Sequence, residues 1–313
     1  MPKEIIINEI SVKPGEKKII NFSIARLPTY TEINLAVHVY RGKEEGPVLL
    51  LTGGLHGDES NGIEIVRRLE ESKLITPKCG TVIAIPIVNV YGFIFNERGV
   101  PDGKDINRSF PGAKDGSLAR MLAYTLMKNI IPIVDYGIDF HTGGASRANY
   151  PQIRCSFNQP IAKELAVSFG APAILHSTLI KHSFRSAAHL KGTPMIVFEG
   201  GESLRLDEHS INEGINGTLR VMNHLGMKDA AVDTFESKIY NNSIWLRAKK
   251  SGLFNSVLEL GAAVSKTEVL GFINDPFGGR KAKVVSSHEG IIIGQNNNPI
   301  VHKGDAVIHI AYN

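Results

Sequence analysis

The sequence predicts an α/β protein with a mixed, largely parallel sheet and helices on both faces, followed by a small C-terminal all-β domain. Three observations carry this prediction. Continuous apolar runs such as residues 48–52 end in paired glycines, as buried parallel strands do. Amphipathic stretches alternate with these runs as far as residue 225. From about residue 240 onward only short strand patterns and turns remain.

The individual elements follow in chain order. Residues 1–44 predict short strands, because they contain β-branched runs and a period-two alternation at 33–39. Further strands are expected at 48–52, 81–88, 136–140 and 194–198, and helices at 58–73, 118–131, 161–169 and 210–225. We therefore divide the chain into an α/β domain over residues 1–235, which includes the strands of 1–44, and a β domain over 236–313.

The C-terminal region contains a weak internal repeat. Residues 252–273 and 290–310 share an apolar pattern, which predicts a β unit with two related halves. This pattern resembles the biotinyl/lipoyl-type sandwich. A carrier domain of that type needs a modifiable lysine at a hairpin tip, and no motif for one is present. We expect the unit to act as a structural or substrate-shaping lid.

Composition narrows the functional class. The 313 residues are 42% hydrophobic and 21% charged, which is typical of a soluble globular protein. Although the net charge is +4, lysine and arginine form only short runs, so nucleic-acid binding is not expected. No apolar stretch is long enough to span a bilayer, and the first residues lack a signal-peptide pattern. Two cysteines, Cys79 and Cys155, form no disulfide framework. We expect a cytoplasmic protein, and homo-oligomerisation stays open.

Three residues at two predicted strand ends have the chemistry of metal ligands. His56 and Glu59 lie in the segment GGLHGDE directly after the strand at 48–52, and His141 ends the next-but-one strand. Ligands collect beyond the carboxyl ends of strands in α/β sheets. Two histidines and one glutamate form a known catalytic zinc set that leaves a position open for water. Single histidines are more often surface or core residues, but the joint placement favours one Zn²⁺ per chain.

Two further segments provide candidates for substrate binding and catalysis. Asn107 and Arg108 stand side by side in a loop, where a guanidinium fork suits a substrate carboxylate. The alternative is a loop arginine that pairs with a surface acid. Glu199 ends the strand at 194–198 and is a candidate general base. The alternative is a carboxylate that caps the next element, and Glu202 is a weaker candidate for the same role.

Four motifs occur in an order that resembles the succinylglutamate desuccinylase/aspartoacylase family, relatives of the zinc carboxypeptidases. They are GLHGDE at 54–59, DINR at 105–108, DFHTG at 139–143 and FEGG at 198–201. The resemblance covers residues 45–225, and the C-terminal β region is in keeping with the family. No single one of these motifs is specific for the family, but their occurrence together in this order is.

The resemblance implies a zinc-carboxypeptidase-like fold and a role for each motif residue. It places zinc at His56, Glu59 and His141, the substrate carboxylate at Asn107 and Arg108, and the general base at Glu199. The family also polarises the scissile carbonyl with an arginine upstream of the Asn-Arg pair, for which we assign Arg98. The loop 96–103 departs from aspartoacylase, which indicates a substrate other than N-acetylaspartate. Arg147, Tyr150 and Arg154 follow His141 and are expected to shape the pocket.

The predicted function is hydrolysis of a linear amide bond by a zinc-activated water, which deacylates an N-acyl amino acid or a similar small carboxylate. One rival is a zinc carboxypeptidase acting on peptides, which a lid over the site would disfavour. Another is a non-catalytic metal-binding module, which needs a fourth protein ligand. Candidates for that ligand are His38, His176, His182 and His189. A serine hydrolase lacks support because no Gly-x-Ser-x-Gly motif occurs.

Overall fold

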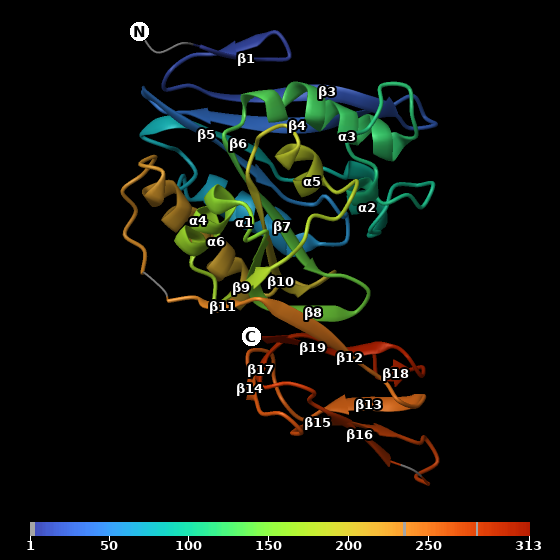
Figure 1. Cartoon of the computed structure of the whole chain (residues 1–313). Helices are drawn as coiled ribbons and strands as arrows, with labels where there is room; N and C mark the ends of the chain where they lie inside the picture. The colour runs from blue at the N-terminus through green and yellow to red at the C-terminus, as the bar shows by residue number, and fades with distance from the viewer. Residues whose placement is uncertain (1–3, 234–235, 280) are drawn as a thin grey trace.

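One large mixed sheet organises the computed structural model, which describes residues 4–233, 236–279 and 281–313. Within these residues thirteen strands form the sheet, and its main path runs β12-β19-β17-β8-β10-β7-β5-β6-β4-β3 (Figure 1). Its first eight strands along the chain are β3 (Lys17–Arg26), β4 (Glu32–Arg41), β5 (Glu44–Thr52), β6 (Cys79–Ile85), β7 (Tyr136–Gly143), β8 (Arg147–Cys155), β9 (Ala173–His176) and β10 (Met195–Glu202). The others are β11 (Lys238–Tyr240), β12 (Asn242–Arg247), β14 (Ala263–Val264), β17 (Gly290–Asn296) and β19 (Ala306–Tyr312).

The centre of this sheet is parallel. β6, β5, β7 and β10 run in the same direction, whereas β4 and β8 join them antiparallel on either side. The ends of β5, β7 and β10 therefore meet at one edge, where α/β proteins bind their ligands. A separate two-stranded sheet of β1 (Ile5–Ile7) and β2 (Ile10–Val12) lies near the N-terminus.

Helices cover both faces of the sheet, as the sequence predicts. They are α1 (Ser60–Glu71), α2 (Val90–Phe95), α3 (Leu118–Asn129), α4 (Pro160–Phe169), α5 (Phe184–His189) and α6 (Glu208–His224), with 3-10 helices η1 (Ile106–Arg108) and η2 (Ile131–Ile133). Leu50 of β5 packs in a core with α3 and α5, while Leu49 and Leu51 pack in a second core with α1, α4 and α6. The continuous apolar run of β5 thus reflects burial on both faces.

Several elements were not predicted from the sequence. β8 contains charged, amide and proline residues that hide its strand character, and β9 is only four residues long. α2 and α5 are six-residue helices, too short to show a helical period. The helix expected at 58–73 begins at Ser60, because residues 53–59 form the loop that leads from β5 into α1.

The C-terminal β region has the reciprocal pairing that its sequence repeat predicts. The strands β13 (Gly252–Ser256), β15 (Val269–Asn274), β16 (Lys281–Val285) and β18 (Ile300–Val301) form a four-stranded sheet. In the first half of the repeat β13 pairs with β15, and in the second half β17 pairs with β19 in the equivalent way. Each half also lends a short strand to the other: β14 pairs with β17, and β18 pairs with β13. β12 on β19 likewise matches β16 on β15. The two halves thus exchange strands around a shared core.

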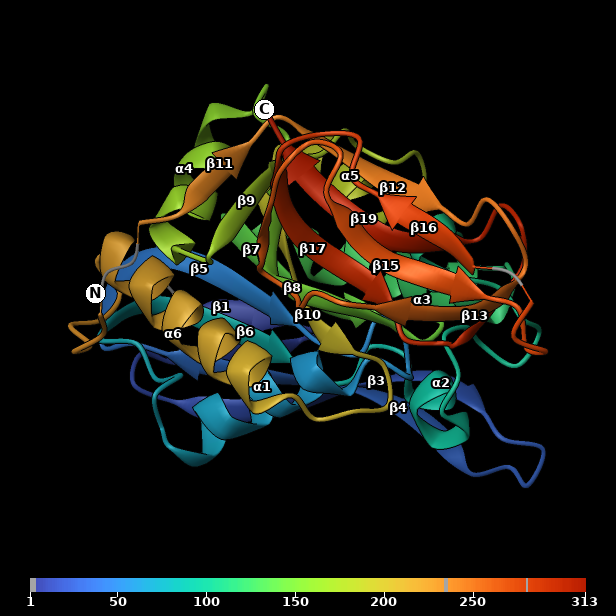
Figure 2. The same ribbon diagram turned by 90° about the horizontal axis from the view of Figure 1, so that it is seen from below.

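The same region also extends the large sheet. β17 pairs antiparallel with β8, so the sheet continues from the α/β part into the C-terminal region, with β17 between β8 and β19 (Figure 2). The boundary predicted at residues 235/236 touches 234–235, which lie outside the described residues, and that division stays a prediction. Among the described residues, no helix combines the length and apolar character required to cross a membrane.

Candidate active site

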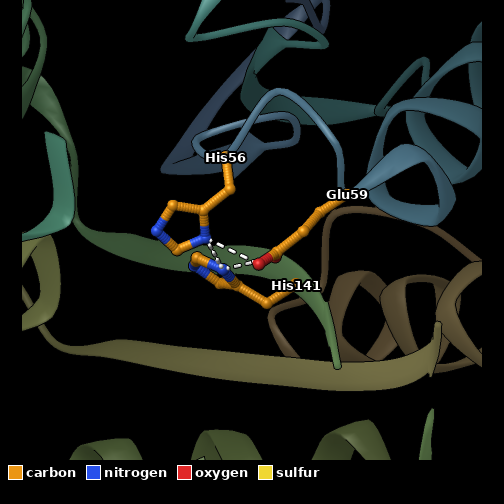
Figure 3. Close-up of side chains that lie close together, drawn as sticks. All are labelled: His56, Glu59 and His141. Atoms are coloured by element: carbon orange, nitrogen blue, oxygen red, sulfur yellow. Dashed lines mark hydrogen bonds and ion pairs between the residues drawn. The ribbon is translucent and has the colours of Figure 1, made fainter. Parts of the chain in front are cut away.

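The loop between β5 and α1 positions two of the three expected ligands. It passes so close to α2 that a Cβ atom on Gly57 would lie 1.9 Å from the carbonyl carbon of Gly92. Glycine at position 57 is therefore required for the close approach that places His56 beside the N-terminus of α1. Glu59 is the N-cap residue of α1, and His141 projects from β7 towards both (Figure 3).

These three side chains converge on one point. Nδ1 of His56 lies 2.8 Å from Oε1 of Glu59, and Nδ1 of His141 lies 2.8 Å from Oε2 of the same carboxylate. The two Nδ1 atoms are 3.1 Å apart. None of the three residues is more than 5% exposed. One ligand atom from each lies within 4.8 Å of the others, so this cluster could hold a metal ion.

A carboxylate contacts the far ring nitrogen of each histidine. Nε2 of His141 is 2.8 Å from Oδ2 of Asp139, and Oδ1 of that aspartate accepts a hydrogen bond from the Thr52 hydroxyl. Nε2 of His56 is 3.2 Å from Oδ1 of Asp105. Such partners hold the proton on the far nitrogen and leave the inner nitrogen free to bind a metal. The sequence motifs contain both aspartates, and the two-residue spacing of Asp139 and His141 on one strand was the available signal.

The electrostatics of the cluster also favour a cation. Burial lowers the pKa of His141, but the charges of Asp139 and Glu59 outweigh it and raise that pKa well above its usual value. Burial raises the pKa of Glu59, yet His56 and His141 hold it well below its usual range. The donor set is thus built to surround positive charge, which fits a metal ion bound at its centre.

A cavity of about 280 Å³ opens beside the cluster, and all seven predicted site residues line it. Arg98 donates from Nη1 to Oε1 of Glu59 over 3.1 Å and from Nη2 to Oδ2 of Asp105 over 3.1 Å. Oδ1 of Asn107 accepts from the backbone N–H of Phe184 over 2.8 Å, which ties the loop with the Asn-Arg pair to α5. The structure therefore brings together residues that are distant in sequence.

Glu199 reaches the cavity from β10 and is held at both oxygens. Nδ2 of Asn149 donates to its Oε2 over 2.8 Å, and Nη1 of Arg154 lies 3.2 Å from its Oε1. Glu202, the weaker candidate for the general base, lies outside the cavity and accepts a hydrogen bond from Asn297. None of His38, His176, His182 and His189, the candidates for a fourth ligand, lines the cavity.

The β8 strand forms one wall of the cavity. Arg147 and Arg154 line it as expected, but Tyr150 faces a different cleft beside His209, so its expected placement was wrong. The reason is a register shift of β8 against β10 between residues 152 and 149, which changes the side-chain alternation along the strand. Period-two counting from His141 cannot locate such a shift.

Sequence reasoning missed several residues that line the cavity, and three of them bear on its chemistry. Asn149 comes from the unpredicted strand β8, and Arg185 from the unpredicted helix α5. Trp245 comes from β12 in the C-terminal region and brings that region into contact with the site. A lone tryptophan more than a hundred residues after the last ligand gives no local signal of this role.

Comparison with known proteins identifies the family of the chain. Residues 45–225 match the succinylglutamate desuccinylase/aspartoacylase catalytic domain. The chain belongs to this family. It is 29% identical, over 85% of its length and 82% of the relative's, to the N-alpha-acetyl-L-2,4-diaminobutyric acid deacetylase of Halomonas elongata.

Solved structures show the same fold. A succinylglutamate desuccinylase/aspartoacylase from Rhodobacter sphaeroides superposes with a TM-score of 0.82 at 25% identity over 95% of both chains. The product-bound ectoine utilization protein EutE from Ruegeria pomeroyi superposes with a TM-score of 0.85 at 22% identity, again over 95% of both chains. The C-terminal β region thus lies largely within the span that these two structures share with the chain.

Proposed function

We propose that this family member is a zinc-dependent deacylase that hydrolyses the amide bond of an N-acyl amino acid. The observation that carries the proposal is the convergence of His56, Glu59 and His141, buried and backed by carboxylates, on a cavity that also contains Glu199. Two imidazoles and one carboxylate are a ligand set of catalytic zinc. No further histidine lines the cavity among the described residues, which leaves the open position that catalysis needs.

Several cavity residues have distinct roles in this proposed reaction. Zinc held by His56, Glu59 and His141 would supply Lewis acidity for activation of the attacking water and of the scissile carbonyl. Glu199 accepts the proton of the attacking water and delivers it to the leaving amine. Asn149 and Arg154 fix both oxygens of that carboxylate, so its orientation is set before substrate binds. Arg98, beside Glu59, donates to the developing oxyanion.

Substrate orientation comes from the loop that contains the Asn-Arg pair. The guanidinium of Arg108 forms a fork for the substrate carboxylate, and Asn107 is anchored to α5. The relative from Halomonas elongata deacetylates an N-acetyl amino acid, which supports the same class of substrate here. Trp245 narrows the cavity from the C-terminal side, which favours a small substrate over a long peptide.

A substrate panel tests this proposal. Amine release is measured from acetyl, succinyl and formyl derivatives of acidic, basic and neutral amino acids, with and without a zinc chelator. We expect release from at least one compound, its loss with chelator and its return on adding zinc. Release only from peptides would instead support the carboxypeptidase, and no release from protein that carries one zinc per chain would support a binding role.

A further inference from the structure

A fully buried asparagine, Asn89, stands at the start of α2 and does not line the cavity. Its Oδ1 accepts a hydrogen bond from the backbone N–H of Gly92 over 2.9 Å, so it caps the helix. Its Nδ2 donates to the carbonyl oxygen of Arg98 over 3.2 Å and to that of Gly99 over 3.0 Å. Exchanging Nδ2 with Oδ1 would bring an oxygen against two carbonyls, so these contacts fix the orientation of the amide.

The segment that receives these two hydrogen bonds has little other support. Residues 96–104 contain turns but no helix or strand, and most of them are exposed. Within the described part of the chain, no backbone N–H donates to the carbonyl oxygen of Arg98 or of Gly99. The side chain of Asn89 therefore ties this segment to α2 at the point where the candidate oxyanion donor, Arg98, leaves the backbone.

Two carboxylates hold the other end of Arg98. Its Nη1 lies 3.1 Å from Oε1 of Glu59, and its Nη2 lies 3.1 Å from Oδ2 of Asp105. The side chain is still 43% exposed and has several rotatable bonds, so these contacts leave other paths open to it. A fixed backbone restricts the positions that the guanidinium can reach. Asn89 thus limits the freedom of the group to which we assign the oxyanion.

The same asparagine also contacts the loop that supplies two of the candidate metal ligands. The backbone N–H of Asn89 donates to the carbonyl oxygen of Gly54 over 2.8 Å, within the loop 53–59. A Cβ atom on Gly92 would lie 2.4 Å from Nδ2 of Asn89 and 2.6 Å from the carbonyl oxygen of Glu97, so this close approach requires glycine there. Asn89 therefore sets the distance between the Arg98 segment and the ligand loop.

We propose that Asn89 is a positioning residue that holds the backbone of Arg98, so that the guanidinium meets the oxyanion of the reaction. The proposal rests on the proposed deacylase function, and Asn89 acts through Arg98 without touching the substrate. An oxyanion donor is effective when its position is set before the reaction, and a displacement of about 1 Å can cost about 100-fold in rate. Since the contact with the oxyanion exists only in the transition state, a looser Arg98 lowers kcat and leaves KM almost unchanged.

Two substitutions remove the anchor and keep the helix cap. Asn89→Ser retains an oxygen that caps α2, but this side chain is too short to reach both carbonyls. It should lower kcat about 10-fold, change KM less than about twofold and retain one metal ion per chain. Asn89→Asp keeps the size and the cap but turns a carboxylate towards the two carbonyls. It should lose at least as much activity, and it replaces Asn89→Ser if that variant does not fold.

A matched asparagine on α6 provides the control. Asn223 also holds a loop with both ends of its amide: Nδ2 donates to the carbonyl oxygen of Ala230 over 2.8 Å, and Oδ1 accepts from the backbone N–H of Ala230 over 2.8 Å. It does not line the cavity. Asn223→Ser should therefore change kcat less than about twofold, even where it lowers stability.

A double-mutant cycle separates positioning of Arg98 from general support of the fold. Arg98→Ala alone should lower kcat about 100-fold, because it removes the oxyanion donor. Adding Asn89→Ser to Arg98→Ala should change kcat less than about twofold, because no guanidinium remains to be misplaced. A second loss of about 10-fold in that background, or an unchanged kcat in Asn89→Ser alone, would overturn the proposal.

Hydrogen exchange gives a readout that does not depend on hydrolysis. The N–H groups of Glu97 and Val100 are bonded to the carbonyl oxygens of Gly92 and Lys104, so their exchange reports opening of the segment. In protein without substrate, Asn89→Ser should speed this exchange about 10-fold, and Asn223→Ser should not. Faster exchange in a protein that hydrolyses no substrate would count against the deacylase function and support the anchor. Hydrolysis by the unmodified protein, with equal exchange in both variants, would remove the anchor alone.

Discussion

The two sides of the cavity are built on different principles. On the side of the candidate metal cluster, the histidines and Glu59 are buried and hydrogen-bonded, and they lie at or just beyond the ends of parallel strands. On the opposite side, Arg147 and Trp245 come from β8 and β12, and the buried Nε atom of the arginine has no hydrogen-bond partner among the described residues. This difference indicates that side chains fixed before substrate binds suit catalysis, whereas a wall whose polar atoms are not all paired suits contact with a bound molecule.

Removing one of the three candidate metal ligands should have the largest effect on activity. His141→Ala should abolish metal binding and lower kcat/KM by about 10³-fold or more, because several kcal/mol of transition-state stabilisation depend on the bound ion. Metal content measured by inductively coupled plasma mass spectrometry checks this directly. His38→Ala is the control, since His38 pairs with Glu70 outside the cavity. One metal ion per chain retained in His141→Ala would show that the cluster is not the site.

Changing the proposed base separates metal binding from turnover. Glu199→Gln should keep a full complement of metal and lower kcat about 10²- to 10³-fold, because the amide cannot accept a proton. Glu202→Gln removes a carboxylate from the same strand outside the cavity and should change kcat less than twofold. Comparable turnover in the two variants would remove Glu199 from the role of base.

A smaller effect is expected from the carboxylate behind the metal site. Asp139→Asn keeps the shape of the side chain but weakens the charge-assisted contact with Nε2 of His141. We expect a 10- to 100-fold loss of metal affinity, with activity recovered at higher zinc concentration. The measurement is a zinc titration against a competing chelator. An unchanged affinity would mean that Asp139 serves folding rather than the metal.

The same contrast explains what the sequence could predict. The ligand side rests on local rules: buried strands end in glycines, and His56, Glu59 and His141 follow directly, so motif and topology suffice. The opposite side rests on long-range pairing. Trp245 reaches the cavity only because the C-terminal region joins the large sheet through β17 and β8, and no local pattern encodes that register.

Irregularity within a strand is a second reason why some site residues could not be predicted from the sequence. The register shift in β8 turns Tyr150 away from the cavity, although the same stretch correctly suggested Arg147 and Arg154. Short strands and six-residue helices such as α5 also leave no periodic signal, which hid Arg185. The α/β class, by contrast, follows from alternating apolar runs and amphipathic helices, which many residues specify together.

The smallest effect is expected on stability, at the buried imidazole of His309 on β19, which stacks against Trp245. The pKa of His309 is lowered by burial, and by the charge of Arg154, from 6.5 to about 3. Below pH 6.5 the unfolded chain therefore takes up a proton that the folded chain refuses, and stability falls as the pH drops from 6.5 towards 3. At pH 5 this costs about 2 kcal/mol relative to pH 7.

The variant His309→Gln isolates this contribution because it cannot titrate. Urea unfolding gives the free energy of unfolding of the unmodified protein and of the variant at pH 7 and at pH 5. The loss of stability between the two pH values is then compared between the proteins, so that the titration of all other groups cancels. We expect the unmodified protein to lose about 2 kcal/mol more than the variant. Equal losses would mean that His309 accepts a proton in the folded state, and the imidazole that stacks against Trp245 would then be charged at acidic pH.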